Sequence, residues 1–160
     1  MRVGFGYDIH VLQAGGGALL LGGHAITQEL RLVGHSDGDV LLHAVSDAIL
    51  GAVGLGDMGA HFPSDDPALK DADSASFLRE AVRLAAERGL RPGNIDCTVV
   101  AGRPRLGEHR HAIECTLAEV ANLDAARVNL KLKSNDGLDA TGRGEAIAAY
   151  AVVLLLDESE

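Results

Sequence analysis

The sequence has no tryptophan, and aromatic residues make up only 3% of it. Binding platforms for single-stranded nucleic acid depend on such rings, so a protein of that class is not expected. Basic residues are also in the minority, since 14 lysines and arginines stand against 23 acidic residues, a formal net charge of −9. This charge argues against binding to a nucleic-acid backbone. It also requires that bound cations, arginines or backbone N–H groups reverse the local field for any anionic substrate.

Cysteines and long apolar stretches are scarce as well. The two cysteines, Cys97 and Cys115, lie in apolar patterns and form no CxxC motif, which predicts buried free thiols in a reducing compartment. The longest apolar run, Ala146 to Leu156, is about half of the ~20 residues that a membrane helix needs. The amino terminus has no signal-peptide pattern. We therefore predict a cytoplasmic protein without a membrane partner.

The composition supplies an aliphatic core instead. Hydrophobic residues make up 47% of the 160 residues, which suits one domain spanning residues 1–160. Strand patterns and helix patterns alternate along the chain, and this predicts an α/β or α+β sandwich with helices on one face of a sheet. The expected strands are Arg2–His10, Ala18–Leu21, Asn94–Val100, Val128–Leu132 and Ala146–Leu156.

Turn and cap residues define the expected connections. Gly15–Gly17 would join the first two strands as a hairpin, and residues 29–34 would be a plain connection. We expect Ser36 or Asp37 to cap a first helix that ends before Gly54. The other expected features are a helix capped by Asp73 or Ser74 and ending near Gly89, a helix at His109–Asn122, loops at Asp57–Asp71 and Ser134–Gly144, and burial of Ala146–Leu156 on both faces.

Asp8 and His10 belong to the first candidate site. They are two residues apart on a predicted strand and therefore point to the same face. With His43 on the first helix they would give one carboxylate and two imidazoles, a known ligand set for Zn²⁺ that leaves a fourth position open. Asp47, four residues after His43, would lie on the same helical face as an outer carboxylate. The alternative is an exposed strand pair and a partly buried helix histidine.

Three further stretches suit phosphate or nucleotide binding, and each also has an ordinary structural explanation. His35 and Ser36 precede a helix whose free N–H groups would meet a phosphate oxygen, or they belong to a plain N-cap segment. The loop Gly102–Arg105 would contact a base edge and phosphate, or it is a solvated basic turn. Ser134 and Asp136 would serve a phosphate and a hard cation such as Mg²⁺, or they are ordinary turn residues.

Together, these motifs closely resemble one family, the 2-C-methyl-D-erythritol 2,4-cyclodiphosphate synthases, which are the cyclising enzymes of the non-mevalonate isoprenoid pathway. The motifs occur in the family's order and span nearly the whole chain. HSDGDxxxH combined with DxH and TGRGE is very specific, whereas no single motif is. The matching segments are Asp8–His10, His35–His43, Gly54–Gly59, Phe62–Pro67, Arg103–Arg105 and Thr141–Glu145.

The resemblance implies a reaction and an assembly. The 2-phosphate of 4-diphosphocytidyl-2-C-methyl-D-erythritol 2-phosphate would attack the β-phosphorus of the same molecule, with CMP leaving and 2-C-methyl-D-erythritol 2,4-cyclodiphosphate forming. Such an enzyme is a phosphorus–oxygen lyase that uses one Zn²⁺ per active site and Mg²⁺ or Mn²⁺ on the substrate diphosphate. The implied assembly is a homotrimer whose sheets face the threefold axis and whose active sites lie between subunits.

The resemblance also implies roles for individual residues. The implied metal ligands are Asp8, His10 and His43 for Zn²⁺, and Asp136 for the second divalent ion. The residues implied to stabilise the transition state are His35 and Ser134. The implied substrate-binding residues are Asp8, His10, His35 and Ser36 around the phosphate and diol, Asp57, Met58 and Gly59 at the ribose, Phe62, Pro63, Ser64, Asp65 and Asp66 over the methylerythritol part, Ala101, Arg103, Pro104, Arg105, Leu106 and Gly107 at the cytosine, Lys133, Ser134, Asn135 and Asp136 at the diphosphate, and Arg143 near the trimer axis.

Two departures from the family pattern affect the chemistry. Residues 133–136 read Lys-Ser-Asn-Asp where the family usually has Thr-Thr-Thr-Glu, so Ser134 keeps a hydroxyl, Asp136 keeps a shorter carboxylate and Lys133 is new. Ala140 replaces the large apolar residue that is common before Thr141, and this weakens the case for an isoprenoid diphosphate site on the axis. Two other functions stay open: another zinc-dependent phosphohydrolase, and a non-catalytic trimeric binder of nucleotides or isoprenoid diphosphates.

Overall fold

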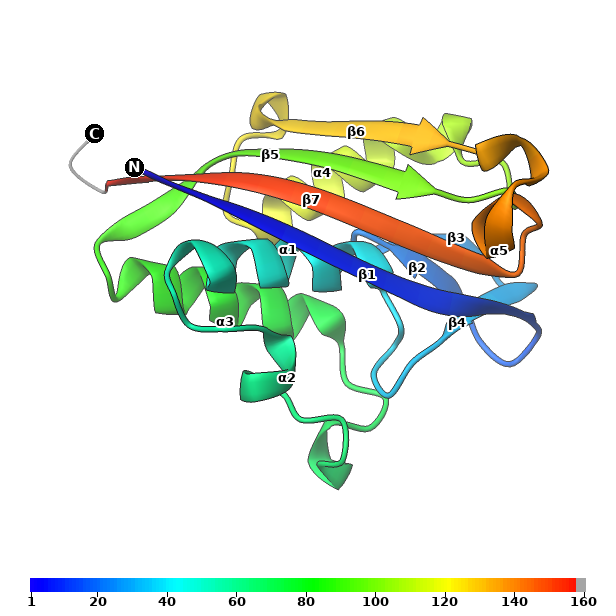
Figure 1. Ribbon diagram of the computed structural model, residues 1–160, viewed down its shortest axis with the longest axis horizontal. Helices are drawn as coiled ribbons and strands as arrows, with labels where there is room; N and C mark the ends of the chain where they lie inside the picture. The colour runs from blue at the N-terminus through cyan, green and yellow to red at the C-terminus, as the bar shows by residue number, and fades with distance from the viewer. Residues whose placement is uncertain (158–160) are drawn as a thin grey trace.

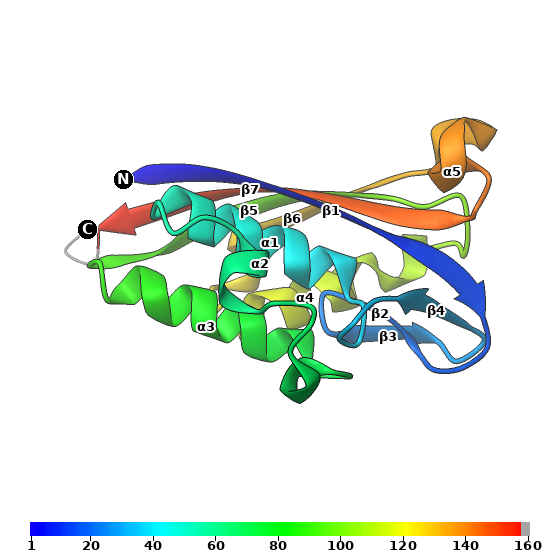
Figure 2. The same cartoon turned by 60° about the horizontal axis from the view of Figure 1, so that its bottom comes forward.

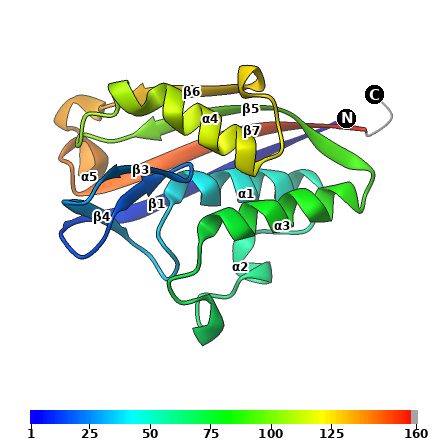
Figure 3. The same cartoon turned by 180° about the vertical axis from the view of Figure 1, so that it is seen from behind.

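The computed structural model describes residues 1–157. Its main sheet has five strands in the order β4-β1-β7-β5-β6 (Figure 1). The helices α1, α3 and α4 lie on one face of this sheet (Figure 3). The strands are β1 (Arg2–Ala14), β2 (Leu19–Leu21), β3 (His24–Thr27), β4 (Leu30–Val33), β5 (Leu90–Val100), β6 (Val128–Lys133) and β7 (Ala146–Asp157). The α-helices are α1 (Val40–Ala52), α2 (Met58–His61), α3 (Ser74–Ala86), α4 (Arg110–Val120) and α5 (Asp139–Gly142), and the short 3-10 helices are η1 (Pro67–Leu69), η2 (Gly107–His109), η3 (Ala125–Arg127) and η4 (Asn135–Gly137).

This arrangement confirms the predicted α/β sandwich with helices on one sheet face. β7 lies in the middle and pairs antiparallel with both β1 and β5, while β6 pairs parallel with β5. The threefold arrangement of sheets that the resemblance implies stays a prediction, because the structure contains one chain.

The strand β1 presents two different faces. Its even-numbered residues, from Gly4 to Leu12, point toward α1 and are buried or half-buried, whereas the odd-numbered residues are exposed. The exposed side is apolar and continues onto β7, where the register pairs Tyr7 with Tyr150. The large apolar side chains exposed on this face are Val3, Phe5, Tyr7, Ile9, Val11, Tyr150 and Val152.

Glycine at two positions of β1 lets α1 lie directly on the strand. A Cβ atom at Gly4 would overlap the backbone oxygen of Ala48, and one at Gly6 would overlap the backbone oxygen of Ala44. Only a residue without a side chain permits this close approach of helix and strand. The approach brings the amino-terminal half of α1 next to Asp8 on the same strand.

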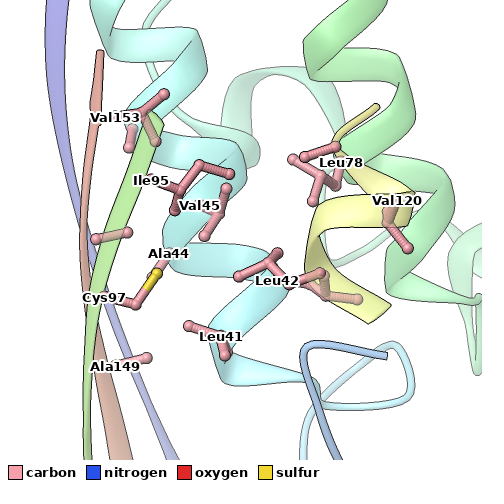
Figure 4. Close-up of a cluster of buried hydrophobic side chains, with 14 of the residues drawn as sticks. Leu41, Leu42, Ala44, Val45, Leu78, Ile95, Cys97, Val120, Ala149 and Val153 are labelled. Atoms are coloured by element: carbon pink, nitrogen blue, oxygen red, sulfur yellow. The ribbon is translucent and has the colours of Figure 1, made fainter. Parts of the chain in front are cut away.

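The helix α1 is the centre of the core. It lies between the sheet and α3, so that Leu41, Leu42 and Val45 are enclosed on all sides (Figures 2 and 4). Its N-cap is Asp39, whose Oδ1 accepts the N–H groups of Leu41 and Leu42, each at 3.1 Å. The predicted caps Ser36 and Asp37 are therefore wrong. Asp39 is itself fully buried, and the N–H groups of residues 22 and 23 also donate to it, which satisfies its carboxylate.

The predicted hairpin of the first two strands is wrong. β1 runs four residues beyond His10, to Ala14, and it pairs with β4 and β7, whereas β2 pairs with β3 in a separate small sheet. Residues 30–33, which lie in the predicted connection, are the strand β4. The glycine run at 15–17 does make a turn, but the partner strand across it could not be read from local sequence, because pairing is decided by distant residues.

Several other boundaries differ from the prediction. The predicted loops at 57–71 and 134–144 contain the short helices α2 and α5 together with η1 and η4. β5 begins at Leu90, four residues earlier than expected. Asp73 caps α3 as predicted, since its Oδ1 accepts the Ala75 N–H at 2.9 Å.

Two predictions of burial need correction. β7 was expected to be buried on both faces, but Tyr150 and Val152 are 39% and 42% exposed, so burial on both faces does not extend along the strand. Cys97 is a buried free thiol, whereas Cys115 is exposed on α4 because it lies on the helix face that points away from the sheet. Among residues 1–157, no helix has the length and apolar composition needed to cross a bilayer.

Candidate metal and substrate site

Asp8, His10 and His43 converge on one point. The Asp8 Oδ2 atom lies 2.9 Å from His10 Nε2 and 2.9 Å from His43 Nδ1, and the two ring nitrogens lie 3.1 Å apart. These side chains are 28%, 19% and 12% exposed, in that order. They form the one group of three or more potential ligands with converging donor atoms among the described residues.

The fold explains why these three side chains meet. Asp8 and His10 occupy the helix-facing positions of β1 that follow the two glycines of the strand. His43 lies in the first turn of α1, and the α1 backbone is held against β1 by that close approach. The spacing in the sequence predicted the shared face of Asp8 and His10, and the packing of α1 supplies the third member.

The charges within the cluster stabilise each other. Burial opposes ionisation of Asp8, but hydrogen bonds from His10 and His43 outweigh it and hold the pKa of the carboxyl well below its ordinary value. Burial likewise opposes protonation of His10, yet the hydrogen bond with Asp8 outweighs it and raises the pKa of the imidazole. The cluster thus holds negative charge on Asp8 and attracts positive charge beside it.

A divalent ion fits this donor set. Three donors placed ~2.0–2.1 Å from one tetrahedral ion lie roughly 3.3 Å apart, and the separations of 2.9–3.1 Å in the structure need only a small expansion. One carboxylate and two imidazoles suit zinc, which often keeps a fourth position for an exogenous oxygen in catalytic sites. The geometry therefore supports a candidate divalent-metal site at Asp8, His10 and His43.

The remaining nitrogen of His43 faces away from the cluster. His43 Nε2 lies 2.8 Å from Ser74 Oγ and 3.1 Å from Ser36 Oγ. Asp47, the predicted outer carboxylate, lines the same cavity, but its Oδ1 accepts the Met58 N–H at 2.7 Å. Asp47 thus anchors α2 to α1, and Ser74 takes the outer position on His43.

A cavity of about 220 Å³ opens beside the candidate metal site. His35 and Ser36 line it from the segment before α1, and His35 Nε2 donates to the Asp66 carbonyl at 2.9 Å, which ties that segment to the following loop. Asp57 lies outside the cavity lining and caps α2, with its Oδ1 accepting the Ala60 N–H at 3.1 Å. The residues that line the cavity are Asp8, His10, His35, Ser36, His43, Asp47, Met58, Phe62, Ser64, Leu69 and Phe77.

A second, larger cavity of about 710 Å³ lies at the ends of β5 and β6. The Ala101 N–H donates to the Lys133 carbonyl at 2.8 Å and so joins the two loops that form it. Ser134 Oγ donates to Asp136 Oδ1 at 2.9 Å, and both residues are exposed. The residues that line this cavity are Ala101, Gly102, Pro104, Arg105, Leu106, Gly107, Glu108, Leu132, Lys133, Ser134 and Asp136.

Two arginines that are predicted to bind substrate, Arg103 and Arg143, form hydrogen bonds within this chain. Arg103 Nε donates to the Gly144 carbonyl at 2.9 Å, and Arg143 makes two hydrogen bonds of 3.0 Å to Glu145. Asn135 Nδ2 donates to Asp139 Oδ2 and to Thr141 Oγ1, each at 3.0 Å, and these bonds stabilise the loop before α5. Gly59, Pro63 and Asp65 belong to the segment from α2 to η1, which borders the smaller cavity through Met58, Phe62 and Ser64.

The two cavities have no lining residue in common. The candidate ligands Asp8, His10 and His43 line the smaller cavity together with His35 and Ser36. Most of the predicted nucleotide loop lines the larger cavity together with Ser134 and Asp136. In one chain the predicted site residues that line a cavity are therefore divided between two separate cavities.

Two residues next to the candidate metal site were not identified from the sequence: Phe77, which lines the smaller cavity, and Ser74, which is completely buried behind His43. Phe77 packs against Phe62 with ring centroids 4.5 Å apart and against His43 at 6.3 Å, and Ser74 bonds to His43. Both lie on α3, where Phe77 looked like an ordinary core residue and Ser74 like a cap. No local signal identifies either, because their role depends on how α3 packs across α1.

These features define an α/β protein with a candidate divalent-metal site between β1 and α1, at the edge of a cavity. Residues 1–156 match the YgbB family, and the chain belongs to that family. A 2-C-methyl-D-erythritol 2,4-cyclodiphosphate synthase from Geotalea daltonii is 52% identical over 155 residues, which are 97% of this chain and 90% of that protein. The family predicted from the sequence motifs is thereby confirmed.

Solved structures agree with this assignment. The bifunctional IspDF from Campylobacter jejuni superposes with a TM-score of 0.93 and 37% identity, covering 99% of this chain and 43% of that chain. A 2C-methyl-D-erythritol-2,4-cyclodiphosphate synthase with CDP bound has a TM-score of 0.88 and 40% identity, covering 97% of this chain and 100% of that chain. The chain thus matches a part of the bifunctional protein and the whole of the CDP-bound one.

Proposed function

We propose that this chain converts 4-diphosphocytidyl-2-C-methyl-D-erythritol 2-phosphate to 2-C-methyl-D-erythritol 2,4-cyclodiphosphate and CMP, as a lyase of isoprenoid precursor biosynthesis. The carrying observation is the convergence of Asp8, His10 and His43 beside His35 and Ser36, in a member of this family. The reaction needs no protein nucleophile, because the nucleophile and the electrophile are two phosphate groups of one molecule. The protein has to fold that molecule and neutralise its charge.

Asp8, His10 and His43 would hold Zn²⁺, and Asp136 would help to hold Mg²⁺ or Mn²⁺ on the substrate diphosphate. When bound, these ions supply Lewis acidity at the phosphoryl oxygens. Asp8 would serve in its ionised form, because a carboxylate binds a divalent ion only when deprotonated. The formal charge of −9 is compatible with an anionic substrate, since the bound cations dominate the local field.

His35 and Ser36 would orient the attacking phosphate. His35 Nε2 is already bonded to the Asp66 carbonyl, so its Nδ1 atom is the one left for a substrate contact. Ser36 Oγ lies 3.1 Å from His43 Nε2, and Ser36 lines the same cavity as the candidate metal ligands. Residues 57–59 would contact the ribose, and residues 62–66 would cover the methylerythritol part and exclude water from the reacting phosphates.

The other half of the site would come from a neighbouring subunit of a homotrimer. Residues 101–107 would receive the cytosine, while Lys133, Ser134 and Asn135 would contact the diphosphate. Two features support this assembly: the two cavities share no residue, and β1 and β7 expose a continuous apolar face. Arg143 near the trimer axis, the absence of nucleic-acid and membrane partners, and the cytoplasmic location stay predictions.

Product analysis tests the proposal. The purified protein is incubated with the CDP-linked substrate, Zn²⁺ and Mg²⁺ in ¹⁸O-labelled water, and the products are analysed by mass. Unlabelled cyclic diphosphate together with CMP is the expected result. Incorporation of ¹⁸O into an open phosphate would instead indicate a phosphohydrolase. Binding without any turnover would indicate a non-catalytic binder, and either outcome contradicts the proposal.

A further inference from the structure

Ser74 lies at the first position of α3 and is completely buried. The chain just before it is tied to the segment that precedes α1: the Asp37 N–H donates to the Ala72 carbonyl at 3.1 Å, and the Asp71 N–H donates to the His35 carbonyl at 2.9 Å. These bonds hold the amino terminus of α3 against the candidate metal site. A buried hydroxyl there must find partners.

The hydrogen bonds around Asp37 decide where the Ser74 proton lies. Ser74 Oγ is hydrogen-bonded to Asp37 Oδ1, which also accepts the Asp39 N–H at 3.1 Å, and Asp37 Oδ2 accepts the Ser74 N–H at 3.0 Å. Both carboxylate oxygens thus face donors, and a carboxylate can only accept. The hydroxyl proton of Ser74 therefore points to Asp37, and its lone pairs remain for His43 Nε2 at 2.8 Å.

An acceptor at Nε2 selects one form of the His43 ring. Asp8 by itself would favour a proton on Nδ1, because its carboxylate lies 2.9 Å from that nitrogen. Ser74 offers the competing acceptor on the opposite side of the ring, and Ser36 Oγ at 3.1 Å lies on that side too. With the proton on Nε2, the lone pair of Nδ1 points at Asp8 and His10, as a metal ligand requires.

We propose that Ser74, held by Asp37, is a positioning residue that keeps His43 in the Nε2–H form with Nδ1 free to bind a divalent ion. The inference rests on the metal site of the proposed function. It assigns Asp37 and Ser74 a common role, an Asp–Ser–His relay in which a serine is inserted into the usual carboxylate–histidine–metal arrangement. Asp37 would thus orient the Ser74 hydroxyl in addition to holding the segment before α1 against α3.

Zinc affinity is the primary test, and Ser76 provides a matched control. Ser76 lies in the same first turn of α3, but it is exposed and donates to the Asp73 carbonyl at 2.6 Å. Loss of an outer-shell partner typically lowers metal affinity ~10- to 100-fold. We expect Ser74→Ala to weaken Zn²⁺ binding by that factor in a chelator competition, and Ser76→Ala to leave it unchanged.

A spectroscopic readout separates positioning from a general loss of structure. In the zinc-loaded protein the His43 Nε2–H should appear as a slowly exchanging imidazole resonance in ¹H–¹⁵N spectra, and Ser74→Ala should abolish its protection. Asp37→Asn should act in the same direction, and the double variant should bind Zn²⁺ no more weakly than Ser74→Ala alone, because both act through one relay.

The inference would be overturned if Ser74→Ala bound Zn²⁺ with an affinity within about twofold of that of Ser76→Ala and its His43 resonance were unchanged. Should Ser74→Ala not fold, Asp37→Asn decides by the same two measurements. Zinc stoichiometry and CMP formation of the unsubstituted protein are measured first. If the unsubstituted protein lacks zinc or forms no CMP, the proposed function is contradicted. If it has normal zinc content and forms CMP but Ser74→Ala behaves like it, only the relay is contradicted.

Discussion

The two cavities of this chain are built in opposite ways. The candidate metal ligands of the smaller cavity are largely buried side chains of β1 and α1, and loop residues and α3 complete its lining. The larger cavity is formed by loops at the ends of β5 and β6, with exposed side chains such as Arg105 and Asp136. Asn135 and Asp136 even hold left-handed backbone conformations, with φ of 56° and 47°.

This difference in construction matches the different requirements of a metal site and a nucleotide pocket. A metal site needs donor atoms placed to within a few tenths of an ångström, and packed core elements provide that placement. A nucleotide pocket that is completed by a neighbouring subunit can stay open until assembly and substrate enclose it. The metal site should accordingly survive changes in the loops, whereas changes at β1, α1 or α3 should impair it.

The largest effect is expected from His43→Ala. Loss of a ligand should remove stoichiometric zinc and lower CMP formation by ~10³-fold or more, because a catalytic metal contributes several kcal/mol of charge stabilisation. Metal analysis and CMP release measure both. His24→Ala is the control, since His24 pairs with His109 at 3.2 Å, away from the cluster. Retention of zinc by His43→Ala would contradict the ligand assignment.

Asp136→Ala should separate the two regions. We expect turnover to fall on the order of 100-fold at fixed Mg²⁺, with a changed Mg²⁺ titration, while bound zinc stays at its normal level. Asp124→Ala, which removes only the cap of η3, serves as the control. An unchanged Mg²⁺ titration would show that Asp136 does not hold the second ion.

Mixing the two inactive variants tests whether the halves meet between subunits. If the protein is a trimer, equal amounts of His43→Ala and Asp136→Ala that exchange subunits at random would give about a quarter of the sites two intact halves. Activity should therefore rise to about a quarter of the normal value after subunit exchange. Sedimentation tests whether the protein is a trimer, and the separate variants measured without exchange provide the baseline. No recovery from exchanging trimers would indicate that each site lies within one chain.

Gly6→Ala should affect the metal site through the fold. The added methyl group would push Ala44, and with it the start of α1, away from β1, at a cost of ~1–3 kcal/mol of unfolding free energy. Zinc affinity should fall in parallel. Gly51→Ala on the exposed side of α1 has open space and should slightly stabilise the protein. Denaturant unfolding distinguishes the two, and equal stability of both variants would refute the close approach.

The smallest effect is expected from alkylation of Cys115. This thiol is exposed, whereas burial raises the pKa of Cys97 to about 12 and leaves it unreactive at neutral pH. Iodoacetamide followed by peptide mass analysis should find the label on Cys115 alone. Cys115 lies outside the lining of both cavities, so zinc content and CMP formation should not change. Labelling of Cys97 in the folded protein would contradict its burial.

Local patterns were sufficient for part of this protein. The period of two placed Asp8 and His10 on one face of a strand, and the apolar stripe from Val40 to Ala52 predicted α1. The ordered motifs identified the family. These features are encoded by residues close together in the chain, where propensity and spacing carry the information.

Tertiary structure decided the rest. The pairing of β1 with β4 and β7 depends on residues far apart in the sequence, and so the predicted hairpin was wrong. Asp39 rather than Ser36 or Asp37 caps α1, and the N–H groups of Gly22 and Gly23 in the turn between β2 and β3 complete its hydrogen bonds. Ser74 reaches His43 only through the packing of α3 on α1. A residue's neighbours across the core are set by packing, and no local pattern records them.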